Sequence, residues 1–193
     1  MSRLYSPGEV VVKGKRFVPF IPAEEIEQAV QSIGATLSQE LDDQKNGLPS
    51  LFVCVLKGAT LFCADLLRSL RGPIHLEFVL ASSYRDGIVS SGSLTFTAPS
   101  GTEIKGRNVI VVEDIIDTGT TVTALRDYFA EHAAASVKVA ALLYKPDANR
   151  NGERPEYFGF EIPNRFVIGY GLDYAEEGRN LAGIYVLDER EEM

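Results

Sequence analysis

Strand-like apolar runs alternate with helix-like stretches over most of this 193-residue chain. Continuous apolar runs are typical of strands buried on both faces, and apolar residues at helical spacing predict amphipathic helices. Strands are predicted at residues 51–56, 74–81, 94–97, 109–112 and 137–144. Helices are predicted from Pro22 to the Asn46-Gly47 stop, over 59–70, and from the end of the 113–121 segment to about residue 134. This alternation predicts an α/β fold around a mainly parallel sheet.

The two ends of the chain have a different character. Residues 1–18 are interrupted by Gly8 and Gly14, which predicts a short irregular or hairpin-like lead. Near the other end, 166–170 and 184–187 predict two short strands with an insertion between them. We therefore predict a single domain, residues 1–193, with a core over about 45–160 and a small subdomain formed by about 1–22 and 161–193.

Composition narrows the range of partners. The formal net charge is −8 at pH 7, whereas surfaces that bind nucleic acid are usually basic. Cys54 and Cys63 lie in apolar patterns without a Cys-x-x-Cys spacing, which favours buried thiols in a reducing compartment. His75 and His132 are far apart in sequence and more typical of structural positions. Because no apolar stretch resembles a signal peptide or a membrane span, we expect a cytoplasmic protein that contacts no membrane.

The strongest functional signal follows the apolar run at 109–112. Glu113 and Asp114 come directly after it, and the segment Asp117-Thr118-Gly119-Thr120-Thr121 then leads into the next helix. Open α/β sheets bind ligands at the carboxyl ends of their strands, and backbone N–H groups of a Gly-containing loop before a helix bind phosphate. Adjacent carboxylates can accept hydrogen bonds from the vicinal hydroxyls of a sugar. The motif therefore predicts a sugar-phosphate site.

With this motif, the chain resembles the type I phosphoribosyltransferases, and within them the hypoxanthine–guanine phosphoribosyltransferases, over roughly residues 22–188. Four further segments match that family in order: 56–58 (Leu-Lys-Gly), the loop 82–92, Lys145-Pro146, and 166–174 followed by Arg179. The resemblance implies a central, mainly parallel sheet flanked by helices, a small hood subdomain and a flexible lid loop. It also implies a magnesium-dependent purine salvage reaction. Hypoxanthine or guanine would react with 5-phosphoribosyl 1-diphosphate to give IMP or GMP and pyrophosphate.

The resemblance assigns the sugar-phosphate half of the site to the motif. Glu113 and Asp114 would hold the ribose hydroxyls. The 5′-phosphate would be bound by Asp117, Thr118, Gly119, Thr120 and Thr121. Asp117 also matches the family's candidate general acid or base beside the imidazole ring of the purine. Taken alone, Asp117 also fits a helix N-cap, but its place after two carboxylates on a buried strand favours the catalytic interpretation.

Other segments would bind the purine and the pyrophosphate, again by resemblance. Lys145 would donate to the purine 6-oxo group, Phe166 would stack on the ring, and the Val167 backbone would meet its pyrimidine edge. Asp173 would border the purine pocket and coordinate Mg²⁺, with Glu113 and Asp114 as further candidate ligands. Lys57, Gly58 and Arg179 would contact pyrophosphate, and the Lys57–Gly58 peptide is often cis in relatives. Ser83 and Tyr84 would belong to the lid. Taken alone, Lys145 also fits an exposed strand end, and Phe166 a core position.

Two alternative functions remain open from the sequence. One is an enzyme of the same fold that prefers xanthine, which would use similar residues. Lys145 and Phe166 disfavour a preference for adenine or uracil. A non-catalytic, nucleotide-sensing regulator would need a basic face for RNA or DNA, which the acidic balance disfavours. The family is usually dimeric or tetrameric, so we expect a homodimer or a homotetramer.

Overall fold

The core of the protein is a six-stranded sheet in the order β5-β4-β3-β6-β7-β8. The computed structural model describes residues 8–42, 47–82, 95–96 and 102–188. The strands of this sheet are β3 (Ser50–Leu56), β4 (Ile74–Ser82), β5 (Thr95–Phe96), β6 (Asn108–Ile116), β7 (Ser136–Tyr144) and β8 (Tyr157–Glu161). Only β5 is antiparallel to its neighbour, and all other pairs are parallel. The predicted mainly parallel α/β fold is confirmed.

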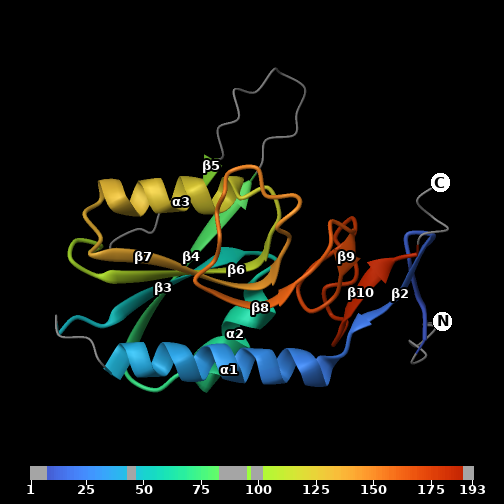
Figure 1. The fold of residues 1–193 in the computed structure, drawn as a ribbon, viewed down its shortest axis with the longest axis horizontal. Helices are drawn as coiled ribbons and strands as arrows, with labels where there is room; N and C mark the ends of the chain where they lie inside the picture. Colours follow the sequence, from blue (N-terminus) through green and yellow to red (C-terminus); the bar gives the residue numbers. More distant parts are fainter. Residues whose placement is uncertain (1–7, 43–46, 83–94, 97–101, 189–193) are drawn as a thin grey trace.

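Helices cover both faces of this sheet (Figure 1). Helices α1 (Ala23–Asp42) and α2 (Thr60–Ser69) lie on one face, and α3 (Thr120–Glu131) lies on the other. Strand β6 is apolar toward both layers: Ile110 and Val112 belong to the core beneath α1 and α2, and Val109 and Val111 to the core beneath α3. A strand covered on both sides must be a continuous apolar run, which explains the sequence pattern.

The strand order identifies the edge where a ligand is expected. From β3 the chain first adds β4 on one side of the strand and later adds β6 on its other side. The direction in which strands are added therefore reverses between β3 and β6. In open α/β sheets such a reversal leaves a crevice at the carboxyl ends of the two strands. Lys57 and Gly58 follow β3, and the Asp117–Thr121 segment follows β6. The two segments therefore border this crevice.

A second, antiparallel sheet combines both ends of the chain and stands beside the main sheet (Figure 1). Its order is β1-β2-β10-β9, with β1 (Val10–Val12), β2 (Lys15–Ile21), β9 (Val167–Ile168) and β10 (Ile184–Leu187). Strands β1 and β2 form the hairpin expected near Gly14. The side chains of Phe17, Ile168 and Leu181 form a separate small core for this sheet. We call this sheet and its connections the hood.

Two elements differ from the predicted pattern. Strand β8 was not predicted, because its sequence is short and contains Gly159. That glycine is explained by packing, since a Cβ there would lie 2.8 Å from the Leu142 carbonyl oxygen. Strand β6 also continues to Ile116, so Glu113 and Asp114 lie within the strand and not beyond its end.

Candidate active site

The adjacent carboxylates of β6 point to opposite faces of the sheet, because side chains alternate along a strand. Glu113 has the same parity as Val109 and Val111 and lines a small cavity on the α3 side. Asp114 has the parity of Ile110 and Val112 and faces the start of α2. Its carboxylate leaves no room for a side chain at Gly58, where a Cβ would lie 1.7 Å from Oδ2. The two acids thus approach the crevice from two sides.

Burial raises the pKa of both carboxylates. Glu113 is 7% exposed, and its Oε2 atom is buried without a hydrogen-bond partner among the described residues. Desolvation, and then the neighbouring Asp114, raise the pKa of Glu113 well above its usual value. Desolvation also raises the pKa of Asp114 to about 6, although the Ile115 amide and the charge of Arg179 favour its ionised form. An unpartnered buried carboxylate oxygen is expected where a ligand hydroxyl or a cation binds.

The loop after β6 forms a small cavity at the start of α3. Its volume is about 80 Å³, and it is lined by Glu113 and by residues 115–122. Gly119 is the N-cap residue of α3 and has a φ of 82°, a conformation that glycine adopts without a Cβ penalty. The N-cap position is thus occupied by Gly119, which has no side chain to cap the helix, so the N-cap interpretation of Asp117 is wrong. The first turn of a helix offers free amides and a positive dipole end, which suit an anion.

Asp117 instead pairs with Lys145. The Lys145 ammonium nitrogen lies 3.1 Å from Asp117 Oδ2, and the lysine side chain is 7% exposed against 47% for the aspartate. Lys145 also donates its backbone N–H to the Ile116 carbonyl, which fixes the end of β7 beside the loop. An exposed position for this lysine is therefore excluded. A buried ammonium group with one carboxylate partner keeps donors for a further acceptor.

Segments from β3 and the hood meet on the other side of the crevice. A Cβ at Gly171, which has a φ of +105°, would lie 2.0 Å from the Gly58 carbonyl oxygen. The Arg179 guanidinium donates to the Gly171 carbonyl and lies 2.7 Å from Asp173 Oδ1. Glycines are thus required where the loop after β3, Asp114 and the hood approach one another. Among the described residues the cis peptide bond is Leu56–Lys57, one bond before Lys57–Gly58, for which the sequence left the isomer open.

Three aromatic residues form a cluster in the hood. The Phe166 ring is 44% exposed and contacts the rings of Phe17 and Tyr174, with centroid distances of 6.3 and 5.7 Å. A core position for Phe166 is therefore wrong. Val167 is buried in β9, where it pairs with Val186. The predicted lid residues Ser83 and Tyr84 lie outside the described residues.

Comparison with known proteins supports this arrangement. The sequence profile of the phosphoribosyl transferase domain matches residues 22–175. The chain belongs to the phosphoribosyltransferase family. A hypoxanthine-guanine phosphoribosyltransferase of Streptococcus pneumoniae (strain ATCC BAA-255 / R6) is 44% identical over 166 residues, which cover 86% of this chain and 90% of the relative. The enzyme of that name from Bacillus subtilis (strain 168) is 41% identical over 167 residues, covering 86% and 91%.

Solved structures agree with this assignment. The crystal structure of a hypoxanthine-guanine phosphoribosyltransferase from Bacillus anthracis matches with a TM-score of 0.79 and 35% sequence identity, and covers 88% of this chain and 98% of that one. A phosphoribosyltransferase core with a hood therefore accounts for both sheets.

Several contacts of this phosphoribosyltransferase are absent from the sequence motifs. Glu176 lies 3.1 Å from the Lys57 ammonium nitrogen, so the predicted pyrophosphate lysine is already paired. The backbone N–H of Glu176 also donates to Asp173 Oδ2. The hydrogen bond from Lys57, and then the charge of that lysine, lower the pKa of Glu176. Because these partners are far apart in sequence or lie in a loop, no local pattern could have identified Glu176 as part of the site.

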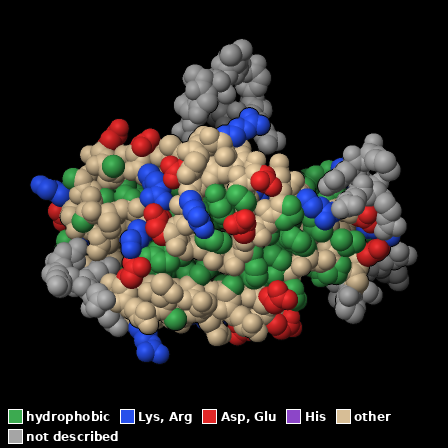
Figure 2. Space-filling model, in the orientation of Figure 1, with side chains coloured by type: hydrophobic (Ala, Val, Ile, Leu, Met, Phe, Trp, Pro, Cys, Tyr) green, Lys and Arg blue, Asp and Glu red, His purple; other side chains and the backbone are tan. Residues whose placement is uncertain are grey.

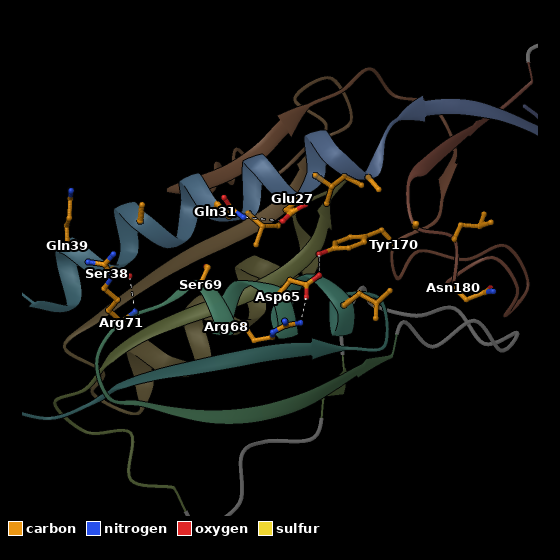
Figure 3. Close-up of a pocket in the computed structure, with 17 residues that line it drawn as sticks. Glu27, Gln31, Ser38, Gln39, Asp65, Arg68, Ser69, Arg71, Tyr170 and Asn180 are labelled. Atoms are coloured by element: carbon orange, nitrogen blue, oxygen red, sulfur yellow. Dashed lines mark hydrogen bonds and ion pairs between the residues drawn. The ribbon is translucent and has the colours of Figure 1, made fainter. Parts of the chain in front are cut away.

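A larger groove lies away from the predicted site residues, between α1, α2 and residues 170–182 (Figure 3). Its volume is about 970 Å³, and none of the predicted site residues lines it. At one end of the groove the Tyr170 hydroxyl donates to Asp65 Oδ2 across 2.6 Å, so α2 is tied to the hood segment that carries Asp173. Tyr170 therefore links the groove to the hood segment of the predicted site.

The remaining sequence predictions concern cysteines, histidines and membrane spans. Cys54 and Cys63 are free and buried, as predicted. The ring Nδ1 of His75 lies 2.9 Å from an Arg107 guanidinium nitrogen, and that of His132 lies 2.7 Å from the Tyr128 carbonyl oxygen. Both histidines thus have structural partners. Within the described residues, no helix is long and apolar enough to cross a membrane.

Proposed function

We propose that this chain transfers the phosphoribosyl group of 5-phosphoribosyl 1-diphosphate to hypoxanthine or guanine, giving IMP or GMP and pyrophosphate. One observation carries the proposal. Asp117 belongs to the loop around the small cavity at α3, and its carboxylate lies 3.1 Å from the buried Lys145 ammonium group. Asp117 therefore lies both in the proposed phosphate loop and beside Lys145, the proposed donor to the purine 6-oxo group. The names of the relatives support the same reaction.

The ribose would lie between the two carboxylates of β6. The 5′-phosphate would be held in the small cavity by the amides and hydroxyls of Asp117, Thr118, Gly119, Thr120 and Thr121. From there, Glu113 would accept from one ribose hydroxyl on the α3 side and Asp114 from the other on the α2 side. The unpartnered Oε2 of Glu113 supports this placement, since a sugar hydroxyl would supply its missing donor.

The pyrophosphate and Mg²⁺ would lie on the hood side, near Lys57, Gly58 and Arg179. Magnesium binds one or two carboxylates and completes its shell with substrate oxygens and water. Asp173 fits this requirement, because Arg179 and the Glu176 amide orient both of its oxygens and leave lone pairs for a cation. Asp114, whose pKa is raised mainly by burial and also by the charge of Asp173, would be a further ligand. The metal would supply charge neutralisation of the pyrophosphate.

The purine would bind between the hood and the end of β7. The exposed ring of Phe166 would stack on one face of the base, and the backbone of Val167 would meet its pyrimidine edge. Lys145 would donate to the 6-oxo group. Against the 6-amino group of adenine the same ammonium would face a donor, which leaves a buried polar group unpaired and disfavours that base.

Asp117 would carry the proton transfer. The purine nitrogen forms a bond to C1′ while the bond from C1′ to the diphosphate oxygen breaks, and pyrophosphate leaves with that electron pair. The proton of the purine imidazole ring passes to the Asp117 carboxylate, which the ion pair with Lys145 orients. The transition state resembles an oxocarbenium ion, so positioning and charge placement dominate the rate enhancement.

An assay of five bases tests the proposal. The protein, Mg²⁺ and 5-phosphoribosyl 1-diphosphate are mixed with hypoxanthine, guanine, xanthine, adenine or uracil, and nucleotides are separated by chromatography. We expect IMP or GMP, and we expect EDTA to abolish their formation until Mg²⁺ is restored. A product from xanthine alone would establish the xanthine alternative instead. Binding of 5-phosphoribosyl 1-diphosphate without any product would favour a regulator.

A nucleic-acid-binding regulator has little support in the charge distribution. On the face drawn in Figure 2, Lys and Arg side chains are interspersed with Asp and Glu over the described part of the chain. With a formal net charge of −8, the protein offers a weak electrostatic attraction for phosphates of RNA or DNA.

We also propose a homodimer or homotetramer in which β4 contributes to the interface. Phe78 and Leu80 are 49% and 48% exposed, although they share a strand face with Leu76, which packs against the core. A second copy that covers this apolar face would remove it from water. Sedimentation of Phe78→Glu should reveal a smaller species than the parent protein, whereas Val11→Glu in the hood should not. A monomeric parent protein would contradict the proposal.

We further propose that residues 1–193 form one domain, with a core over about 45–160 and a hood from about 1–22 and 161–193, in the cytoplasm. The contact of Gly171 with Gly58 supports a single unit, because the hood and the core share one packed interface. The two free, buried thiols support a reducing compartment.

A further inference from the structure

Residues 147–156, between Lys145-Pro146 and β8, pack against the start of α3, although the sequence motifs give them no function (Figure 1). Arg150 donates its backbone N–H to the Thr118 carbonyl, with an N–O distance of 3.3 Å. A Cβ at Gly119 would lie 2.9 Å from Asn149 Oδ1 and 3.2 Å from Glu153 Cβ. The loop therefore fixes the backbone that surrounds the proposed phosphate cavity.

Thr123 and Glu153 connect this loop to the first turn of α3. The Thr123 hydroxyl lies 3.0 Å from the Gly119 carbonyl oxygen and 3.2 Å from Glu153 Oε1. Asn151 donates a side-chain N–H to the same hydroxyl across 3.2 Å. Glu153 thus reaches the phosphate loop through a single hydroxyl group. A carboxylate so close to a site for a phosphate dianion repels it unless a cation neutralises the carboxylate.

Arg126 is that cation. Its Nε atom forms an ion pair with Glu153 Oε2 at 3.0 Å but makes no hydrogen bond within the described residues, whereas its Nη2 atom donates to both oxygens of Glu156 at 3.0 and 2.9 Å. It also donates to the Val137 carbonyl across 2.8 Å, which anchors the guanidinium to β7. The Arg126 and Glu153 side chains are only 24% and 19% exposed, so solvent screens their interaction incompletely. Arginine suits this position because its planar fork serves several acceptors at once.

We propose that Arg126 is a positioning residue for the binding of the 5′-phosphate. It holds Glu153 against Thr123 and Gly119, and it offsets the negative charge of Glu153 beside the phosphate loop. The inference rests on the proposed function for the identity of the anion. It assigns no contact between Arg126 and the substrate.

Binding of ribose 5-phosphate tests this role without catalysis. Calorimetry should give a dissociation constant about tenfold higher for Arg126→Gln than for the parent protein, as for one lost charge interaction at a coupled site. The KM for 5-phosphoribosyl 1-diphosphate should rise in parallel, while the KM for hypoxanthine and kcat stay nearly unchanged. Adding Glu153→Gln to Arg126→Gln should restore most of the affinity, because the uncompensated charge is then removed.

Lys138→Gln is the matched control. It breaks a different ion pair, between Lys138 of β7 and Glu40 of α1, which has a nitrogen–oxygen distance of 2.5 Å and lies outside the phosphate loop. It should lower the melting temperature and leave the affinity for ribose 5-phosphate unchanged. If Arg126→Gln does not fold, Arg126→Lys replaces it, with an expected loss of about threefold in affinity because the charge remains and the fork is lost.

The outcomes separate this inference from the proposed function. Unchanged affinity in Arg126→Gln and Arg126→Lys would overturn the role of Arg126, and so would an equal rise in every kinetic constant. Failure of the added Glu153→Gln to restore affinity would overturn the charge argument. A parent protein that binds ribose 5-phosphate but makes no nucleotide from any base would refute the proposed function, and the effect of Arg126→Gln on binding would still stand.

Discussion

Replacing Gly58 by alanine should displace the carboxylate of Asp114. The backbone of Gly58 lies outside the left-handed region, so alanine adds only its methyl group. That methyl carbon would lie 1.7 Å from Asp114 Oδ2 and 2.5 Å from its Cγ. The oxygen must move by about 1.7 Å to regain an ordinary contact of 3.4 Å. Such a movement also disturbs the hydrogen bond from the Ile115 amide to Oδ1, which is 2.9 Å long.

This displacement should be costly for catalysis. An error of about 1 Å in a positioned group can cost about 10²-fold in rate, and Asp114 is proposed to hold a ribose hydroxyl. We expect kcat/KM for 5-phosphoribosyl 1-diphosphate to fall by about 10²-fold in Gly58→Ala. Initial rates of IMP formation, at saturating hypoxanthine and varied 5-phosphoribosyl 1-diphosphate, measure this loss.

Two control glycines separate the effect from general damage. Gly34→Ala places a methyl group 1.9 Å from Ser69 Oγ, between α1 and α2 and away from the predicted site residues. It should lower the melting temperature and leave kcat/KM unchanged, because the overpacking is confined to the helix layer. Gly8→Ala has no atom within 4 Å and should change neither quantity. If Gly58→Ala keeps the parent kcat/KM, the assignment of Asp114 to the ribose site is wrong.

Three further predictions concern the acids and the lysine. Asp117→Asn should lower kcat by about 10²–10⁴-fold and change both KM values little, and equal activity would remove its proton-transfer role. Lys145→Ala should reduce the preference for hypoxanthine over adenine by about 10²-fold or more, as a panel of bases would measure. The pKa of Asp114 is raised by folding from 3.8 to about 6, so its effect on stability is most favourable below pH 4 and is lost as the pH rises through 6. Asp114→Asn should therefore stabilise the protein in urea at pH 8 by up to about 3 kcal/mol, and much less at pH 4. Equal stabilisation at both pH values would refute the raised pKa.

The strands and helices of the core could be predicted from local pattern alone. Buried runs such as 51–56 and 109–112 are apolar on both faces, so they identify parallel strands covered by helices. Strand β8 was not predicted, because a short edge strand that contains Gly159 has no continuous apolar run. Its place beside β7 depends on a close backbone approach, which the sequence does not encode locally.

For the candidate site too, some features follow from the sequence and others only from the tertiary structure. The sequence determined the residue types and their order: two carboxylates after a buried run, a Gly-containing loop before a helix, and a lysine at a strand end. It could not decide whether Asp117 caps a helix or Lys145 is exposed, because each answer depends on a partner distant in sequence. Only the tertiary structure brought Asp117 to Lys145, Gly58 to Asp114, and Glu153 to the phosphate loop. The physical reason is that local patterns report backbone preference and burial, whereas charge pairing and close packing form between segments that meet only after the sheet has assembled.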